Sequence, residues 1–188
     1  PEVLSNGLCS LNPKVDRLVM VCEMDVGPAG AIKSHKFHEA IIHSHARLIY
    51  DQVADFLFEG GDDETCEPLR ADLQNLQAVY NALAKARKRR HAIEFDTKEV
   101  IFEYNDKRKI ENIHPYERNE AHLLIEECMI AANICAAKFL KKHKIPALFR
   151  IHEGPNPDKV PAMIEFLMAY GVTMTGSEPT PQAYAAAL

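Results

Sequence analysis

The alternation of hydrophobic and polar positions along the chain predicts two antiparallel hairpins. The apolar runs 17–26 and 31–44 flank a Gly-Pro-Ala-Gly turn and are long enough to form an extended two-stranded ribbon. A shorter pair of runs, 100–104 and 109–113, is joined across an Asn-Asp turn and is expected to form a second hairpin.

A second hydrophobic period, of three and four residues, predicts helices. They are expected over 47–58, 66–91, 118–143 and 158–170, and a Gly-Gly pair marks the end of the first. The most regular apolar seam belongs to the second of these helices and is formed by Leu69, Leu73, Leu76, Tyr80 and Leu83.

The remaining segments are short. Residues 1–15 contain Asn-Gly and Asn-Pro pairs and are expected to be a loop. Residues 93–96 and 148–152 are expected to be single strands. Together these elements predict an α+β fold with mixed helices and mainly antiparallel strands, over a length that suits one domain.

The helix predicted over 118–143 carries the first candidate functional residue. Apolar side chains occupy nearly every direction around it, so we expect it to be buried on all sides. Glu126 nevertheless shares one stripe with Asn119 and Asn133. Burying an unpaired carboxylate costs several kcal/mol. Glu126 therefore requires either an ion pair with a nearby Arg or Lys, which the spacing favours, or a substrate-facing groove.

Two aromatic residues have alternative interpretations. Tyr50 shares a helical stripe with Val53 and Leu57, which places it at the edge of the core, but a strand-to-helix corner is also where ligand clefts form. Phe95 lies on the same strand face as Ile93, and a core position is the first interpretation. An exposed Phe95 would instead stack a nucleobase, a contact worth about 1–3 kcal/mol.

The charge balance restricts the partners that the chain can bind. The 188 residues include 22 Lys+Arg against 27 Asp+Glu, a net charge of −5, which excludes a general electrostatic grip on a polyanion. The cationic cluster at 85–90 is expected to be a solvated helix end, where cations complement the helix dipole, or else a phosphate-contact patch. No apolar run approaches the ~20 residues of a membrane helix.

Metal-binding and disulfide patterns are weak. The five cysteines form no Cys-x-x-Cys pair, which predicts reduced thiols in a cytosolic protein. The histidines at 35, 38, 43 and 45 lack the further ligands of a zinc site. The acidic run 62–64 lacks the alternation of a calcium loop, so we expect a solvated surface there.

Four stretches together resemble a known family. They are PEVLSNGLCSLNP at 1–13, SHARLIY at 44–50, RNEAHLLIEECMIAAN at 118–133 and ALFRIH at 147–152. In this order they are similar to the catalytic (RNB) domain of the ribonuclease R / ribonuclease II family, with ribonuclease R the nearer branch. The resemblance implies a processive 3′→5′ exoribonuclease that releases nucleoside 5′-monophosphates, with Mg²⁺ held by a cluster of aspartates.

The resemblance also implies roles for three residues. Tyr50 and Glu126 match family residues beside the last nucleotides, close to the ribose, where a 2′-OH distinguishes RNA from DNA. Phe95 matches an aromatic residue that closes one end of the stack of bases. The implied partner is the 3′ end of single-stranded RNA, with no preference for DNA and no membrane.

Parts of the family pattern are missing from the sequence. The aspartate cluster, a Ser-Pro-Ile-Arg-Arg motif and the flanking cold-shock and S1 domains have no counterpart here, and the chain begins at a proline. We therefore expect 1–188 to be an internal fragment of a single RNB catalytic domain from a cytoplasmic protein, with no catalytic or metal-binding residues of its own. The resemblance implies Mg²⁺ for the parent enzyme, no bound metal and no activity for the fragment, and a fold that the rest of the parent chain completes. The alternative is a non-catalytic RNA- or protein-binding module on an RNB scaffold.

Overall fold

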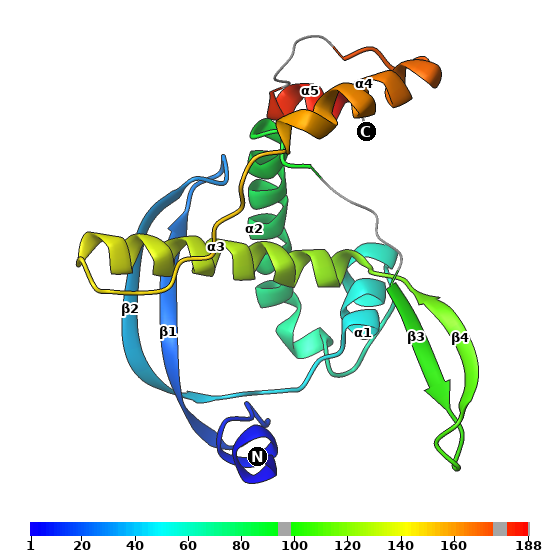
Figure 1. The fold of residues 1–188 in the computed structure, drawn as a ribbon. Helices are drawn as coiled ribbons and strands as arrows, with labels where there is room; N and C mark the ends of the chain where they lie inside the picture. Colours follow the sequence, from blue (N-terminus) through cyan, green and yellow to red (C-terminus); the bar gives the residue numbers. More distant parts are fainter. Residues whose placement is uncertain (94–98, 175–179, 188) are drawn as a thin grey trace. The chain divides into compact units, whose positions relative to one another are not determined.

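The structure is a computed structural model that describes residues 1–93, 99–174 and 180–187. Its internal contacts divide the chain into two units, which are treated separately below. Unit 1 combines Pro1–Ala84 with Arg118–Ile145, and unit 2 combines Lys85–Glu117 with Pro146–Leu188. Figure 1 shows the path of the chain through the elements of each.

Unit 1 begins with the longer predicted hairpin, which the structure confirms. β1 (Asp16–Val26) and β2 (Ile32–His43) pair antiparallel in a register that runs from Asp16 opposite His43 to Met24 opposite His35. Gly30 lies in the turn with φ of 72°, a conformation that glycine adopts without a steric penalty.

The prediction of a loop over 1–15 is wrong in part. Val3–Leu8 forms a short π-helical segment, η1, in which the Cys9 N–H donates to the carbonyl of Leu4 over 2.9 Å. The Asn6-Gly7 pair lies within this segment, and Gly7 is not among the residues with positive φ. The pair therefore does not adopt the turn conformation that its composition favours, and the local helical hydrogen bonds continue through it.

The predicted helices of unit 1 are present. The first consists of α1 (Tyr50–Ala54) and the π-helical η2 (Asp55–Glu59), and it ends at Gly60, whose φ is 81°. The second consists of the 3₁₀ turn η3 (Glu67–Leu69) and α2 (Arg70–Arg89), whose last turn belongs to unit 2. The third is α3 (Glu120–Lys142). The helices before α3 share a core of buried residues: Phe56, Cys66 and Leu73.

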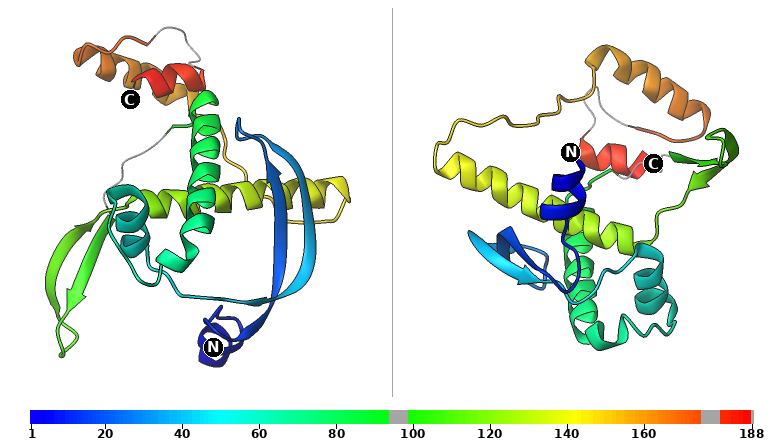
Figure 2. Two further views of the ribbon diagram at one scale, coloured as in Figure 1. Left: turned by 180° about the vertical axis from the view of Figure 1, so that it is seen from behind. Right: turned by 90° about the horizontal axis from the view of Figure 1, so that it is seen from below.

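The expectation that α3 is buried on all sides is wrong for the described structure. One face is buried, through Ala121, Leu124, Glu127, Ala131 and Cys135. On other faces Ile125, Met129 and Ile134 are exposed, Met129 by 59%. The apolar composition of α3 is uniform, but within the described residues α1, α2 and the β1–β2 hairpin supply neighbours for part of its circumference (Figure 2).

Unit 2 contains the second predicted hairpin, formed by β3 (Glu99–Tyr104) and β4 (Ile110–Tyr116) in antiparallel pairing. The helix predicted over 158–170 is also confirmed, as η4 (Pro157–Lys159) and α4 (Val160–Ala169). A further helix, α5, follows over Pro181–Ala187.

The strand predicted over 148–152 is not observed. This segment is irregular, and Leu148 and Ile151 are largely exposed. An extended segment becomes a strand only when a neighbour completes its backbone hydrogen bonds, and no described strand pairs with it. Most of the strand predicted over 93–96 lies outside the described residues. The elements nevertheless confirm the α+β class, and no described helix is long and apolar enough to cross a membrane.

Candidate functional site

Tyr50 is the first residue of α1, at the corner where the chain leaves β2. The Val53 N–H donates to the carbonyl of Ile49 over 3.1 Å, and the Ile49 N–H reaches Oε1 of Gln52 at 3.4 Å. These bonds turn the extended chain into a helix at Tyr50. The Tyr50 side chain remains 44% exposed, so it lies at the surface of unit 1 rather than in its core.

The first turn of α3 is closed by a reciprocal pair of contacts. Asn119 is the N-cap: its Oδ1 accepts the His122 N–H over 3.3 Å, while its own backbone N–H donates to Nδ1 of His122 over 3.2 Å. This exchange satisfies two backbone donors at the start of the helix, as a capping box does. The Asn119 amide also donates to Oδ1 of Asp51 over 2.8 Å, which joins the start of α3 to the start of α1.

The two helix starts are joined a second time through their rings. The rings of Tyr50 and His122 are stacked, with centroids 3.9 Å apart and planes at 23°. His122 and Glu126 are four residues apart on α3 and therefore occupy the same face of the helix on successive turns. The structure thus brings Tyr50 to the side of α3 that carries Glu126. These two candidate residues lie 76 positions apart in the sequence.

Glu126 has the ion pair that its spacing favoured. Its Oε2 lies 3.1 Å from Nη1 of Arg118, just before the helix begins. The side chain of Glu126 is 34% exposed, so the carboxylate is neutralised by a partner and still accessible. The two interpretations of Glu126, structural ion pair and open groove, are therefore compatible with one another.

A cavity of about 470 Å³ opens beside this cluster within unit 1. Tyr50 and Arg47 contribute polar groups, and aliphatic side chains of α1, α2 and α3 form most of the wall. Arg47 is exposed and has no ion pair within the part of the chain that the structure describes. An apolar wall with a phenol and a guanidinium suits a ligand with a flat or apolar body and an anionic group. The apolar lining residues are Leu48, Ile49, Val53, Leu73, Leu76, Ala121, Leu124 and Ile125.

Phe95, the third predicted contact, lies outside the described residues. His122, Asp51 and Arg47 belong to the site but were not predicted from the sequence. A signal for His122 was present, because Asn119 and His122 have the N-cap-to-N3 spacing of a capping box. Asp51 and Arg47 have no comparable signal, since their roles depend on the approach of two separate helices.

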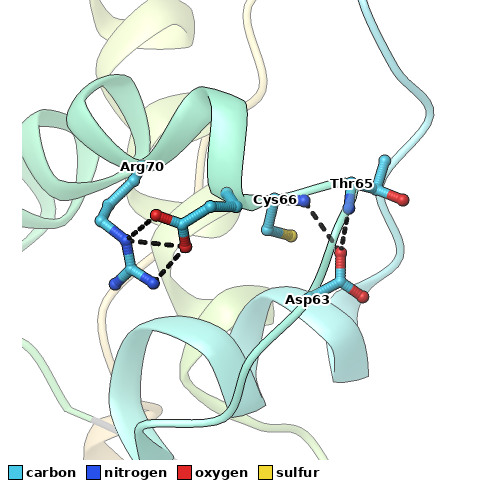
Figure 3. Close-up of polar contacts among 5 residues, drawn as sticks. Asp63, Thr65, Cys66 and Arg70 are labelled. Atoms are coloured by element: carbon cyan, nitrogen blue, oxygen red, sulfur yellow. Dashed lines mark hydrogen bonds and ion pairs between the residues drawn. The ribbon is translucent and has the colours of Figure 1, made fainter.

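In the acidic loop after Gly60-Gly61, Asp62 and Glu64 are exposed, as expected of a solvated surface, whereas Asp63 has a structural role. The carboxylate of Asp63 accepts the backbone N–H groups of Thr65 and Cys66, each over 2.8 Å (Figure 3), and the Gln52 amide over 2.7 Å. These bonds, with that from Gln52 the largest contribution, lower the pKa of Asp63. Burial raises the pKa of the adjacent Cys66 thiol to about 11.

Other candidate clusters do not form a metal site. Nδ1 of His43 lies 2.8 Å from Oδ1 of Asp16, within hydrogen-bond distance. Across residues 1–93, 99–174 and 180–187, no three His, Cys, Asp or Glu side chains are grouped to hold a metal ion. The cationic residues of 85–90 include the last turn of α2, where they complement the helix dipole. Their alternative role as a phosphate contact stays a prediction.

Comparisons with known proteins agree on one family. The model of the RNB domain matches residues 1–187. Ribonuclease R of Vibrio parahaemolyticus is 50% identical over 188 residues, and ribonuclease R of Escherichia coli K12 is 49% identical; each alignment covers 98% of this chain. The chain spans 22% and 23% of the length of these two relatives.

A solved structure extends the likeness to the fold. The complex of Mycoplasma genitalium RNase R with ribose-methylated single-stranded RNA superposes with a TM-score of 0.91 at 29% identity. That alignment covers the whole of this chain and 30% of the other. The same relative has also been solved with double-stranded RNA, with a TM-score of 0.90.

Proposed function

Because the chain belongs to the RNB domain family, we propose that it forms part of a 3′→5′ exoribonuclease of the ribonuclease R type, which hydrolyses RNA to nucleoside 5′-monophosphates. The identity of about 50% with ribonuclease R over nearly the whole chain supports this. The single structural observation that carries the proposal is the joint position of Tyr50 and Glu126 on one side of the first turns of α3.

Within that enzyme, Tyr50 and Glu126 contact the ribose at the 3′ end of RNA. A phenol can donate or accept a hydrogen bond, and a carboxylate accepts one from a 2′-OH, which DNA lacks. A site that hydrogen-bonds a hydroxyl discriminates strongly against the analogue without it. Arg47, which lines the cavity together with Tyr50, supplies a cation for a backbone phosphate.

The metal chemistry of the proposed reaction is assigned, within this proposal, to other parts of a longer enzyme. Mg²⁺ would position and activate the attacking water, and the described side chains do not include a cluster that fits it. Mg²⁺ would therefore be held by residues outside the described part of this chain. It follows that the 188-residue chain alone should release no mononucleotides from RNA.

A chimaera tests the proposed function. Residues 1–187 of this chain would replace the matching segment of Vibrio parahaemolyticus ribonuclease R, and mononucleotide release from 3′-labelled RNA would be measured. We expect activity within about tenfold of the host enzyme, because the two segments share half their residues and Mg²⁺ is supplied by the host. A folded chimaera that binds RNA but releases no mononucleotide would contradict the proposal.

The ribose contact has its own test in the chimaera. The measured quantity is the ratio of kcat/KM for an RNA 3′ end to that for an otherwise identical 2′-deoxy end. Tyr50→Ala and Glu126→Ala should each lower this ratio about tenfold or more, since each removes a partner of a hydroxyl. Tyr170→Ala and Glu39→Ala, on exposed residues remote in sequence, serve as matched controls and should leave it unchanged.

The second candidate is a non-catalytic RNA- or protein-binding module on an RNB scaffold. One observation favours it: the β3–β4 hairpin exposes a continuous apolar face, formed by Val100, Phe102, Tyr104, Ile110 and Ile113. An inactive chimaera that retains tight RNA binding would support this module instead of the enzyme.

A further inference from the structure

The Tyr50 side chain lies at the first position of a helix of five residues and is half exposed. No described group hydrogen-bonds to its hydroxyl, and its ring stacks on the ring of His122. A side chain in such a place samples several rotamers unless a neighbour restricts it. The stacked ring of His122 is a neighbour that restricts the direction of the phenol at the edge of the cavity.

We propose that His122 is a positioning residue: it holds the Tyr50 ring so that the phenol and the Glu126 carboxylate face the same ribose, and it thereby sets the preference for RNA over DNA. This inference rests on the proposed function. It adds a residue that touches neither the reacting atoms nor, in this arrangement, the sugar.

The imidazole can act as a support because it is itself fixed. Nδ1 of His122 lies 3.2 Å from the backbone nitrogen of Asn119 and 2.7 Å from Oδ1 of the same residue. Asn119 is held in turn by its amide bond to Asp51, the neighbour of Tyr50. Tyr50, Asp51, Asn119 and His122 thus form a closed ring of contacts between the two helix starts.

The arrangement offers two variants that separate the ring from the helix cap. His122→Gln retains an acceptor for the Asn119 N–H, as in an ordinary capping box, but removes the ring. His122→Phe retains a ring that can stack on Tyr50 but removes the acceptor. If His122 only caps the helix, His122→Phe should impair the enzyme more than His122→Gln. If His122 positions Tyr50, His122→Gln should lower the preference for RNA more than His122→Phe.

The test measures the same kcat/KM ratio in the chimaera. We expect His122→Gln to lower the RNA-to-DNA ratio about two- to tenfold, the range that corresponds to one stacked aromatic pair. His122→Phe should change the ratio less than about twofold while lowering the unfolding midpoint. A partly unfolded enzyme loses activity on both substrates equally, so a purely structural role would not move the ratio.

An NMR measurement on the 188-residue chain tests the contact between His122 and Tyr50 without the chimaera. The ring protons of Tyr50 should lose their ring-current shift in His122→Gln and keep one in His122→Phe. Unchanged Tyr50 signals in His122→Gln would overturn the positioning role, as would equal ratios in the two variants where Tyr50→Ala does lower the ratio. If Tyr50→Ala itself leaves the ratio unchanged, the ribose contact fails instead, and the Tyr50 signals still decide whether His122 positions the ring.

Discussion

The two hairpins of the molecule both alternate apolar and polar residues, but they differ in what covers them. In β1–β2, Phe37 packs edge to face on Phe139 of α3, with ring centroids 5.2 Å apart, and half-buried residues recur along both strands. In β3–β4, every residue of β3 is exposed, although Val100, Phe102 and Tyr104 make one face apolar. Strand alternation therefore predicts a hairpin and its faces, whereas burial depends on a neighbour elsewhere in the chain.

The largest expected difference between the hairpins is in amide exchange. A two-stranded hairpin without a covered face is marginally stable in water, so β3–β4 should open locally far more often than β1–β2. We expect hydrogen–deuterium exchange of the β1–β2 amides to be at least about 100-fold slower. Equal protection in the two hairpins would show that β3–β4 is covered in solution, for example by a second copy of the chain.

A matched pair of substitutions measures the same difference as a free energy. Phe37→Ala should lower the free energy of unfolding by about 2 kcal/mol, from lost apolar burial and the lost aromatic pair. Phe102→Ala should change it by less than about 0.5 kcal/mol, because the ring is exposed. Urea unfolding followed by circular dichroism gives both values, and a Phe102→Ala effect as large as that of Phe37→Ala would contradict the contrast.

These elements show which parts of the fold a sequence determines locally. Residue spacing correctly predicts both hairpins, the helices and the break at Gly60, because each depends on hydrogen bonds and side chains within a short segment. The strand predicted over 148–152 fails for the opposite reason, since a strand requires a partner that spacing does not reveal. The expectation that α3 is buried on all sides fails for the same reason, since burial requires neighbours that residue spacing does not reveal.

The residues of the candidate site also separate into those that the local sequence reveals and those that depend on contacts between distant segments. Glu126 could be found because a carboxylate in an apolar helix is conspicuous, and its ion pair was expected. The stacking of His122 on Tyr50 could not be found, because it joins residues 72 positions apart. The structural role of Asp63 in the acidic loop was also missed, because its three hydrogen bonds come from two separate segments.

Thiol reactivity offers a further measure of how well the covered face of β1–β2 is protected from solvent. Burial raises the pKa of Cys22, with a smaller contribution from the neighbouring Cys135 of α3, whereas Cys9 is exposed. Since the thiolate is the nucleophile, Cys22 should react with iodoacetamide at pH 8 about tenfold more slowly than Cys9. Peptide mapping after timed alkylation separates the two sites, and urea should abolish the difference.

The smallest expected effect is the coupling energy of an exposed histidine–carboxylate pair, which should be similar in the two hairpins. Each carries an exposed histidine–carboxylate pair: His43 with Asp16 at 2.8 Å in β1–β2, and His114 with Glu103 at 3.7 Å in β3–β4. Exposed ion pairs contribute about 0.2–1 kcal/mol at most, because water screens them. Double-mutant cycles with Ala should therefore give coupling energies below about 0.5 kcal/mol in both hairpins, despite the shorter distance in the first. A clearly larger coupling in β1–β2 alone would mean that packing against α3 strengthens even its exposed face, and the difference between the hairpins would then extend beyond apolar burial.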